Sequence, residues 1–125
     1  MWKEARVPEF TYVERAAEMA EFTAGRVKPV SVLKSTGANV VMFAFEPGTE
    51  LREHTAYQPA LLQAIEGSLI VRLCGETITL TPGDLLHLEP HVPHSVEAAE
   101  RARLQLTVLM IDSPGPSHIP LEENR

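Results

Sequence analysis

The stretch that decides the fold is PGTELREHTAYQPALLQAIEG, residues 47–67. It opens on a Pro-Gly turn, continues through a short alternating run at 50–54, and closes on a run rich in Leu, Ala and Ile at 60–66, which ends at Gly67. Short apolar runs between Gly and Pro residues are typical of β-strands. The stretch therefore predicts two strands joined by a loop, with His54 at the end of the first strand.

The same pattern extends on both sides of this stretch. Nine short strands in fewer than a hundred residues predict a closed or double-sheet barrel, because closure removes the exposed sheet edges that promote aggregation. We therefore predict an all-β jelly-roll barrel at residues 27–112. Its strands are expected at 28–34, 39–46, 50–54, 60–66, 69–74, 76–80, 84–89, 94–98 and 103–111.

Residues 11–23 show a helical period instead. Thr11 and Glu14 have the spacing of a capping box, and Gly25 stands where a left-handed C-terminal cap is expected. We predict an N-terminal arm with one short amphipathic helix at residues 1–26, and an aperiodic tail at 113–125. The apolar face of this helix would consist of Tyr12, Val13, Ala16, Met19 and Ala20.

The run from Val40 to Phe45 is apolar on both faces of its predicted strand. One face points into the barrel, so something else must cover the other face. The N-terminal helix and a second subunit are both suitable covers. A homodimer is therefore expected.

Composition restricts the class of protein. The 125 residues suit one domain, and a formal net charge of −6 argues against nucleic acid or a membrane surface as a partner. A single cysteine, Cys74, excludes an internal disulfide, no run approaches the roughly 18 apolar residues of a membrane span, and no signal peptide is recognised at the start. These features predict a cytoplasmic protein.

Two motifs in this chain resemble those of the cupin superfamily. Gly48, His54 and Gly67 match the spacing of the first cupin motif, G-x5-H-x-H-x3-E-x6-G, and the stretch from Gly75 to His94, with its Pro93-His94 end, resembles the second motif. The resemblance covers residues 28–111. It implies a small jelly-roll barrel, usually dimeric, whose motif side chains meet inside the barrel.

The usual cupin metal site has three histidines and a glutamate. His54 matches the first histidine and His94 the last, whereas Ala56 and Ala60 stand at the second histidine and the glutamate. Two protein ligands rarely hold a divalent metal tightly. Candidates to complete the shell are His91, three residues before His94, and the amide oxygens of Gln58 and Gln63, which flank the position of the missing glutamate. The expected cofactor is one divalent transition metal (Fe, Mn, Ni or Zn).

Two interpretations of the role of these histidines stay open. They hold a metal, or they line a pocket and form hydrogen bonds with each other, with water or with a ligand. The favoured function is a barrel that binds a small molecule. The alternative is a metal-dependent enzyme, such as a dioxygenase, isomerase or decarboxylase, acting on a small polar substrate, with His54 or His94 as general acid or base. The other residues predicted to line the pocket are Gln58, Gln63, Tyr57 and Met42.

Overall fold

The computed structural model describes residues 4–6 and 9–110. The nine predicted barrel strands are confirmed, with bounds that differ from the predicted ones by at most two residues. The predicted tail at 113–125 lies outside the described residues. The barrel strands are β3 (Val27–Lys34), β4 (Ala38–Phe45), β5 (Glu50–His54), β6 (Ala60–Glu66), β7 (Leu69–Leu73), β8 (Glu76–Leu80), β9 (Leu86–Leu88), β10 (His94–Glu97) and β11 (Ala102–Leu109).

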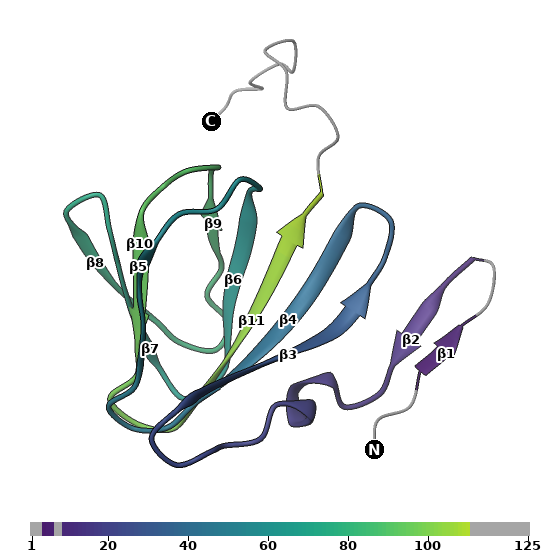
Figure 1. Cartoon of the computed structure of the whole chain (residues 1–125), viewed down its shortest axis with the longest axis horizontal. Helices are drawn as coiled ribbons and strands as arrows, with labels where there is room; N and C mark the ends of the chain where they lie inside the picture. The colour runs from purple at the N-terminus through teal and green to yellow at the C-terminus, as the bar shows by residue number, and fades with distance from the viewer. Residues whose placement is uncertain (1–3, 7–8, 111–125) are drawn as a thin grey trace, which may run out of the picture.

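The barrel consists of two antiparallel sheets (Figure 1). One sheet has the strand order β3-β4-β11-β6-β9 and the other β5-β10-β7-β8. From β4 to β7 the chain changes sheet at every connection, and it does so again from β8 to β11. This alternation is the jelly-roll topology expected from the sequence.

The inner faces of the two sheets form one apolar core. Phe45, Leu62 and Leu104 project into it from the five-stranded sheet, and Leu69 and Val71 from the four-stranded sheet. All five are buried. The strict alternation along β6 and β11 produces this face, because every second residue points inward.

The prediction of an amphipathic helix at 11–23 is wrong. The segment instead contains β2 (Thr11–Val13), paired with β1 (Glu4–Arg6), and a four-residue 3-10 helix, η1 (Ala16–Met19). Thr, Tyr and Val favour strands, so the first turn of the expected helix pairs as a hairpin. Gly25 does have a positive φ of 73°, but it belongs to the turn between Thr23 and Arg26 and caps no helix. Among the described residues, no helix is long and apolar enough to cross a membrane.

The second apolar face of β4 is covered by residues 16–22, which we call the strap. Ala20 in the strap forms a buried cluster with Val32, Met42 and Ala44 on the outer face of β3 and β4. Of the two covers considered, the N-terminal segment is therefore the one present. The homodimer stays a prediction, and the apolar face on which it was based no longer requires a second subunit.

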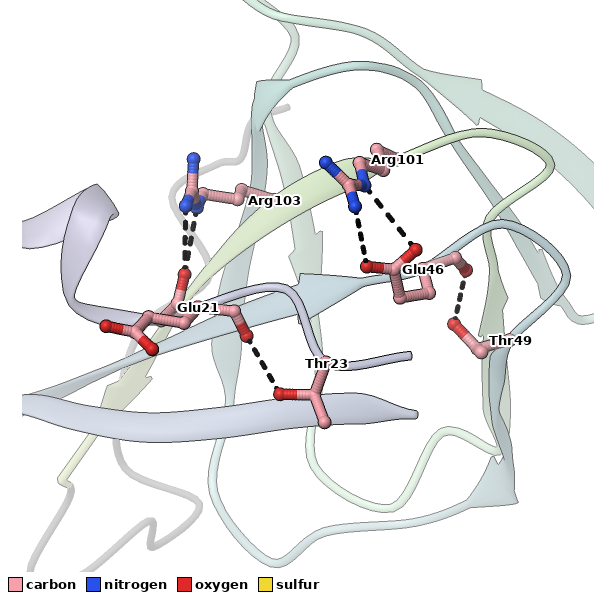
Figure 2. Close-up of polar contacts among 7 residues, drawn as sticks. Glu21, Thr23, Glu46, Thr49, Arg101 and Arg103 are labelled. Atoms are coloured by element: carbon pink, nitrogen blue, oxygen red, sulfur yellow. Dashed lines mark hydrogen bonds and ion pairs between the residues drawn. The ribbon is translucent and has the colours of Figure 1, made fainter. Parts of the chain in front are cut away.

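Arg103 on β11 fastens the strap to the barrel (Figure 2). Its Nε and Nη2 atoms both donate to the backbone oxygen of Ala20, at 3.1 and 3.0 Å, and its Nη1 atom donates to Glu66 at 2.7 Å. The guanidinium also lies 4.4 Å from the ring centre of Phe22, which Arg101 approaches at 4.9 Å. Charge-assisted hydrogen bonds thus add to apolar burial in holding the strap.

Candidate functional site

His54 and His94 meet at one end of the barrel. His54 is the last residue of β5, His94 is the first residue of β10, and the two are direct partners across the strand pair. Their ring centres are 4.3 Å apart and the rings are tilted by 55°. His54 is exposed, whereas His94 is only 8% exposed and is the one buried polar side chain among the described residues.

Both rings are oriented by the backbone in the same way. The Nδ1 atom of His54 lies 2.8 Å from the carbonyl oxygen of Arg52, and that of His94 lies 2.8 Å from the carbonyl oxygen of Val92. A carbonyl oxygen can only accept a hydrogen bond, so Nδ1 must carry the proton in each neutral ring. Each Nε2 atom is therefore a lone-pair acceptor, the form in which imidazole binds a metal or a hydrogen-bond donor.

This tautomer assignment is directly testable. In ¹⁵N-detected NMR spectra of the neutral protein, we expect His54 and His94 to show a protonated Nδ1 and an unprotonated Nε2. The exposed His87, whose Nδ1 lies 3.9 Å from a Glu89 carboxylate oxygen, is the internal comparison. A protonated Nε2 on His54 or His94 would contradict the assignment.

The structure does not bring His91 into the pair as a third ligand. His91 has a left-handed backbone (φ 68°), and its N–H group donates to the carbonyl oxygen of Ala56 at 2.8 Å. Its ring packs edge-on against Tyr57, with the ring centres 5.7 Å apart. Residues 91 and 57 thus join two loops at the same end of the barrel, and Tyr57 itself is 83% exposed.

A closed metal shell does not form from the described residues. Within residues 9–110, no group of three or more His, Cys, Asp or Glu side chains is suitably placed for a metal. Ala56 is exposed and Ala60 is buried in the core, so methyl groups occupy the two positions that ligands fill in the usual cupin site. Among the His, Cys, Asp and Glu side chains of the described residues, His54 and His94 therefore have no third ligand beside them.

Two of the residues predicted to line the pocket lie on the opposite face of the sheet. Met42 is fully buried beneath the strap, in the cluster with Ala20. Gln63 points the same way, because Gln105 on β11 pairs with Met42 on one side and with Gln63 on the other. The assignment of both residues to the pocket is corrected. Alternation predicts which residues share a face, and for β4, apolar on both sides, it does not say which face lies inside.

Gln58 is partly buried in the loop between β5 and β6, two residues after Ala56. Two further groups at the site, the backbone oxygens of Arg52 and Val92, were not predicted. A carbonyl belongs to every residue, so no side-chain pattern could have identified them. The i−2 position relative to each histidine is the only feature that they share.

With this geometry in hand, comparison with known proteins identifies the family. The family model described as "Cupin domain" matches residues 41–111, which is more than half of the chain. The chain belongs to the cupin domain family. The matched region runs from β4 through both histidines and extends past the end of β11.

Solved cupin structures share the fold at low sequence identity. A cupin superfamily protein from Desulfitobacterium hafniense superposes with a TM-score of 0.70 at 20% identity, over 76% of this chain and 87% of that one. An RmlC-like cupin from Shewanella frigidimarina superposes with a TM-score of 0.68 at 22% identity, over 88% and 96%. At such identities the likeness establishes the fold and not the ligand.

One curated protein matches a shorter part of the chain. A 2-C-methyl-D-erythritol 4-phosphate cytidylyltransferase from Carboxydothermus hydrogenoformans is 38% identical over 50 residues, which are 40% of this chain. The match spans only 22% of that protein. Its activity therefore has no bearing on the cupin barrel described here.

Proposed function

We propose that the protein binds a small molecule at the end of the barrel where His54 and His94 meet. The observation that carries this proposal is the histidine pair, two rings 4.3 Å apart whose Nδ1 atoms each lie 2.8 Å from a backbone carbonyl oxygen. Membership of the cupin family supports a small-molecule-binding barrel in general terms. The specific ligand site is our inference from the two imidazoles.

The surroundings of the pair favour a ligand with one polar end. Leu73 is the register partner of His94 on β7, and Val92 lies two residues before His94. Both pack against the apolar core. Two neutral imidazoles present two acceptor nitrogens, so they select for a hydrogen-bond donor or a metal, while the apolar neighbours favour a nonpolar body.

Binding is better supported than the alternative of a metal-dependent enzyme. Catalytic zinc sites, for example, hold the metal through three protein ligands, and His91 lies beside Tyr57 instead of joining the pair. A divalent metal (Fe, Mn, Ni or Zn) would be held by His54 and His94, and it would act there as a Lewis acid. The protein's own contribution is to orient both rings through the carbonyl oxygens of Arg52 and Val92.

A metal-free ligand screen tests this proposal. The probes are small carboxylic acids, amines and polyols, added in the presence of a chelator while the thermal midpoint and the histidine ring signals are recorded. We expect at least one class to raise the midpoint, since a ligand at about 100 times its Kd stabilises the folded state by about 2.7 kcal/mol. The same ligand should shift the His54 and His94 signals.

The matched variants are His54→Ala and His87→Ala. Both histidines are exposed, but His87 lies on β9 opposite Leu61 on the outer face, away from the pair. The stabilisation should disappear in His54→Ala and persist in His87→Ala. A ligand that stabilises both variants equally, or a complete screen without a shift at either ring, would contradict the proposed site.

A further inference from the structure

The strap covers only part of the outer face of the five-stranded sheet. Its apolar contacts are with β3 and β4, and on β11 Arg103 bonds to its Ala20 carbonyl. Further along β11 and on the neighbouring β6 lie five outward-facing, half-buried residues without charge, which we call the outer patch: Leu61, Gln63, Gln105, Thr107 and Leu109. An uncharged sheet face that carries leucines is typical of a surface covered by another surface.

The outer face of the four-stranded sheet has a different character. Arg72 on β7 and Glu97 on β10 form an ion pair there at 2.6 Å, with 51% and 36% of their side chains exposed. Thr77 and Thr79 on β8 are exposed as well. Charged and polar side chains are what a face in contact with water carries. The absence of charge is therefore a feature of the outer patch and not of both sheets.

Two amide side chains lie within the outer patch. Gln63 on β6 and Gln105 on β11 are register partners, and within the described part of the chain neither amide group forms a hydrogen bond. Each amide offers two donor hydrogens and one acceptor oxygen. A surface that presents amides in return satisfies both functions. A second copy of the chain, related by a two-fold axis, presents these same amides.

Charge also favours a second copy over a charged partner. A basic or acidic partner is recognised through charged side chains, and the outer patch has none. Two copies with a formal net charge of −6 each repel one another least where uncharged surfaces meet. The ion pair between Arg103 and Glu66 lies at one end of the patch, as charged groups do at the rim of an interface.

The area of this face indicates that a stable dimer needs a second contact. The strands β11, β6 and β9 lie about 4.8 Å apart, and the eight residues of β11 extend about 3.3 Å each, which gives roughly 400 Å². A stable interface buries about 800 Å² per partner. The outer patch and its surroundings on these three strands therefore supply about half of the area.

The β1–β2 hairpin can supply the other half. It pairs with no strand of the barrel and stands beyond β3 (Figure 1). Phe10, just before β2, and Tyr12 within β2 are 60% and 56% exposed. An isolated two-stranded hairpin is marginally stable in water, so further burial would stabilise it. The hairpin leads into the strap, which places its base on the same outer side of the sheet as the patch.

We propose that a second copy of this chain docks on the outer patch, and that the β1–β2 hairpin of each copy packs against the other copy. The outer patch provides the uncharged centre of the interface, and the two pairs of amides, Gln63 and Gln105 from each copy, hydrogen-bond across it. This interface is separate from the proposed ligand site, because the histidine pair lies on the four-stranded sheet.

Sedimentation equilibrium of the full chain tests the interface with a matched pair of variants. We expect the parent chain to form a dimer with a Kd of about 10 µM or tighter. Thr107→Glu places two like charges in the interface and should raise the Kd at least about a hundredfold. Thr79→Glu makes the same change on the outer face of the four-stranded sheet and should leave the Kd unchanged.

Two further variants keep the test independent of folding. Gln105→Glu preserves the shape of the side chain and adds only charge, so it should also raise the Kd, with circular dichroism confirming the fold of each variant. The double variant Phe10→Ser, Tyr12→Ser tests the hairpin and should weaken the dimer at least about tenfold.

Three results would overturn the inference. A parent chain that remains monomeric at about 200 µM has no such interface. A dimer that tolerates both Thr107→Glu and Gln105→Glu in folded protein, or that is lost in Thr79→Glu, forms through another surface. A dimer that is unchanged in the Phe10→Ser, Tyr12→Ser variant would remove the hairpin from the interface.

Discussion

Substituting Gly67 with alanine is expected to lower the free energy of unfolding by about 3 kcal/mol, one of the two largest effects that we predict for this chain. Gly67 lies between β6 and β7 with a φ of 71°, a left-handed conformation that costs an L-residue about 1–2 kcal/mol. A Cβ atom there would lie 2.2 Å from the carbonyl oxygen of Arg101 and 3.0 Å from the Cα of Ala102. Both contacts are with backbone, which cannot rotate away.

The neighbouring chain has little freedom to move. Ala102 begins β11, which is hydrogen-bonded to β4 on one side and to β6 on the other. Any shift at residues 101–102 therefore disturbs the centre of the five-stranded sheet, and it also displaces Arg103, which holds the strap. The clash should cost stability beyond the left-handed backbone itself.

Gly75→Ala provides the matched control. Gly75 has nearly the same φ, 75°, but a Cβ added there would meet no atom within 4 Å. We expect it to cost about 1 kcal/mol, the left-handed backbone alone. Urea unfolding of both variants measures the difference. Equal losses would show that the sheet accommodates the Gly67 methyl group and that the close approach carries no energetic weight.

The barrel could be predicted because two local signals agree along most of the chain. A two-residue period within the runs and Gly or Pro between them specify strands and turns without reference to the rest of the fold. The observed φ values of Gly67 and Gly75 agree with the predicted turns, since both residues lie in turns that need a positive φ. The motif spacing also predicted His54 and His94, which the structure brings together.

The wrong predictions concern residues whose local sequence pattern is compatible with two different structures. Ala16, Ala17 and Met19 are good helix formers at helical spacing, yet they pack as one short 3-10 turn across β3 and β4. Met42 lies on a strand that is apolar on both faces, so the sequence pattern does not indicate which face is inside the barrel. In the structure Met42 packs under the strap, a tertiary contact that the local pattern does not contain. His91 packs against Tyr57 on a loop that has a left-handed backbone at that residue, and spacing along the chain does not reveal either feature.

Arg103→Ala is the second large effect, with an expected loss of about 3 kcal/mol in the free energy of unfolding. The Arg103 side chain is only 14% exposed, and it makes two hydrogen bonds to the Ala20 carbonyl, one to Glu66 and a cation–π contact with Phe22. Hydrogen bonds to charged groups contribute about 1.5–3 kcal/mol each, and they do not add fully. The variant would also leave the carbonyl oxygen of the buried Ala20 without these donors.

Arg101, which contacts the strap through Phe22, provides a control. It also lies over Phe22 and pairs with Glu46 at 3.2 Å, but its side chain is 62% exposed, so Arg101→Ala should cost less than about 1 kcal/mol. Arg103→Lys should fall between the two, because lysine keeps the charge and loses the planar fork that reaches Ala20 and Glu66 together. Chemical unfolding of the three variants gives this order.

Hydrogen exchange identifies the segment that the Arg103 contacts stabilise. If Arg103 fastens the strap, Arg103→Ala should speed amide exchange in residues 20–33 and leave the His54 and His94 ring signals in place, since the two histidines lie on the other sheet. A strap released in this way would uncover Val32, Met42 and Ala44, and the variant should then bind a hydrophobic dye. If Arg103→Ala costs no more than Arg101→Ala, apolar burial alone holds the strap, and the guanidinium contacts to Ala20 and Phe22 are energetically minor.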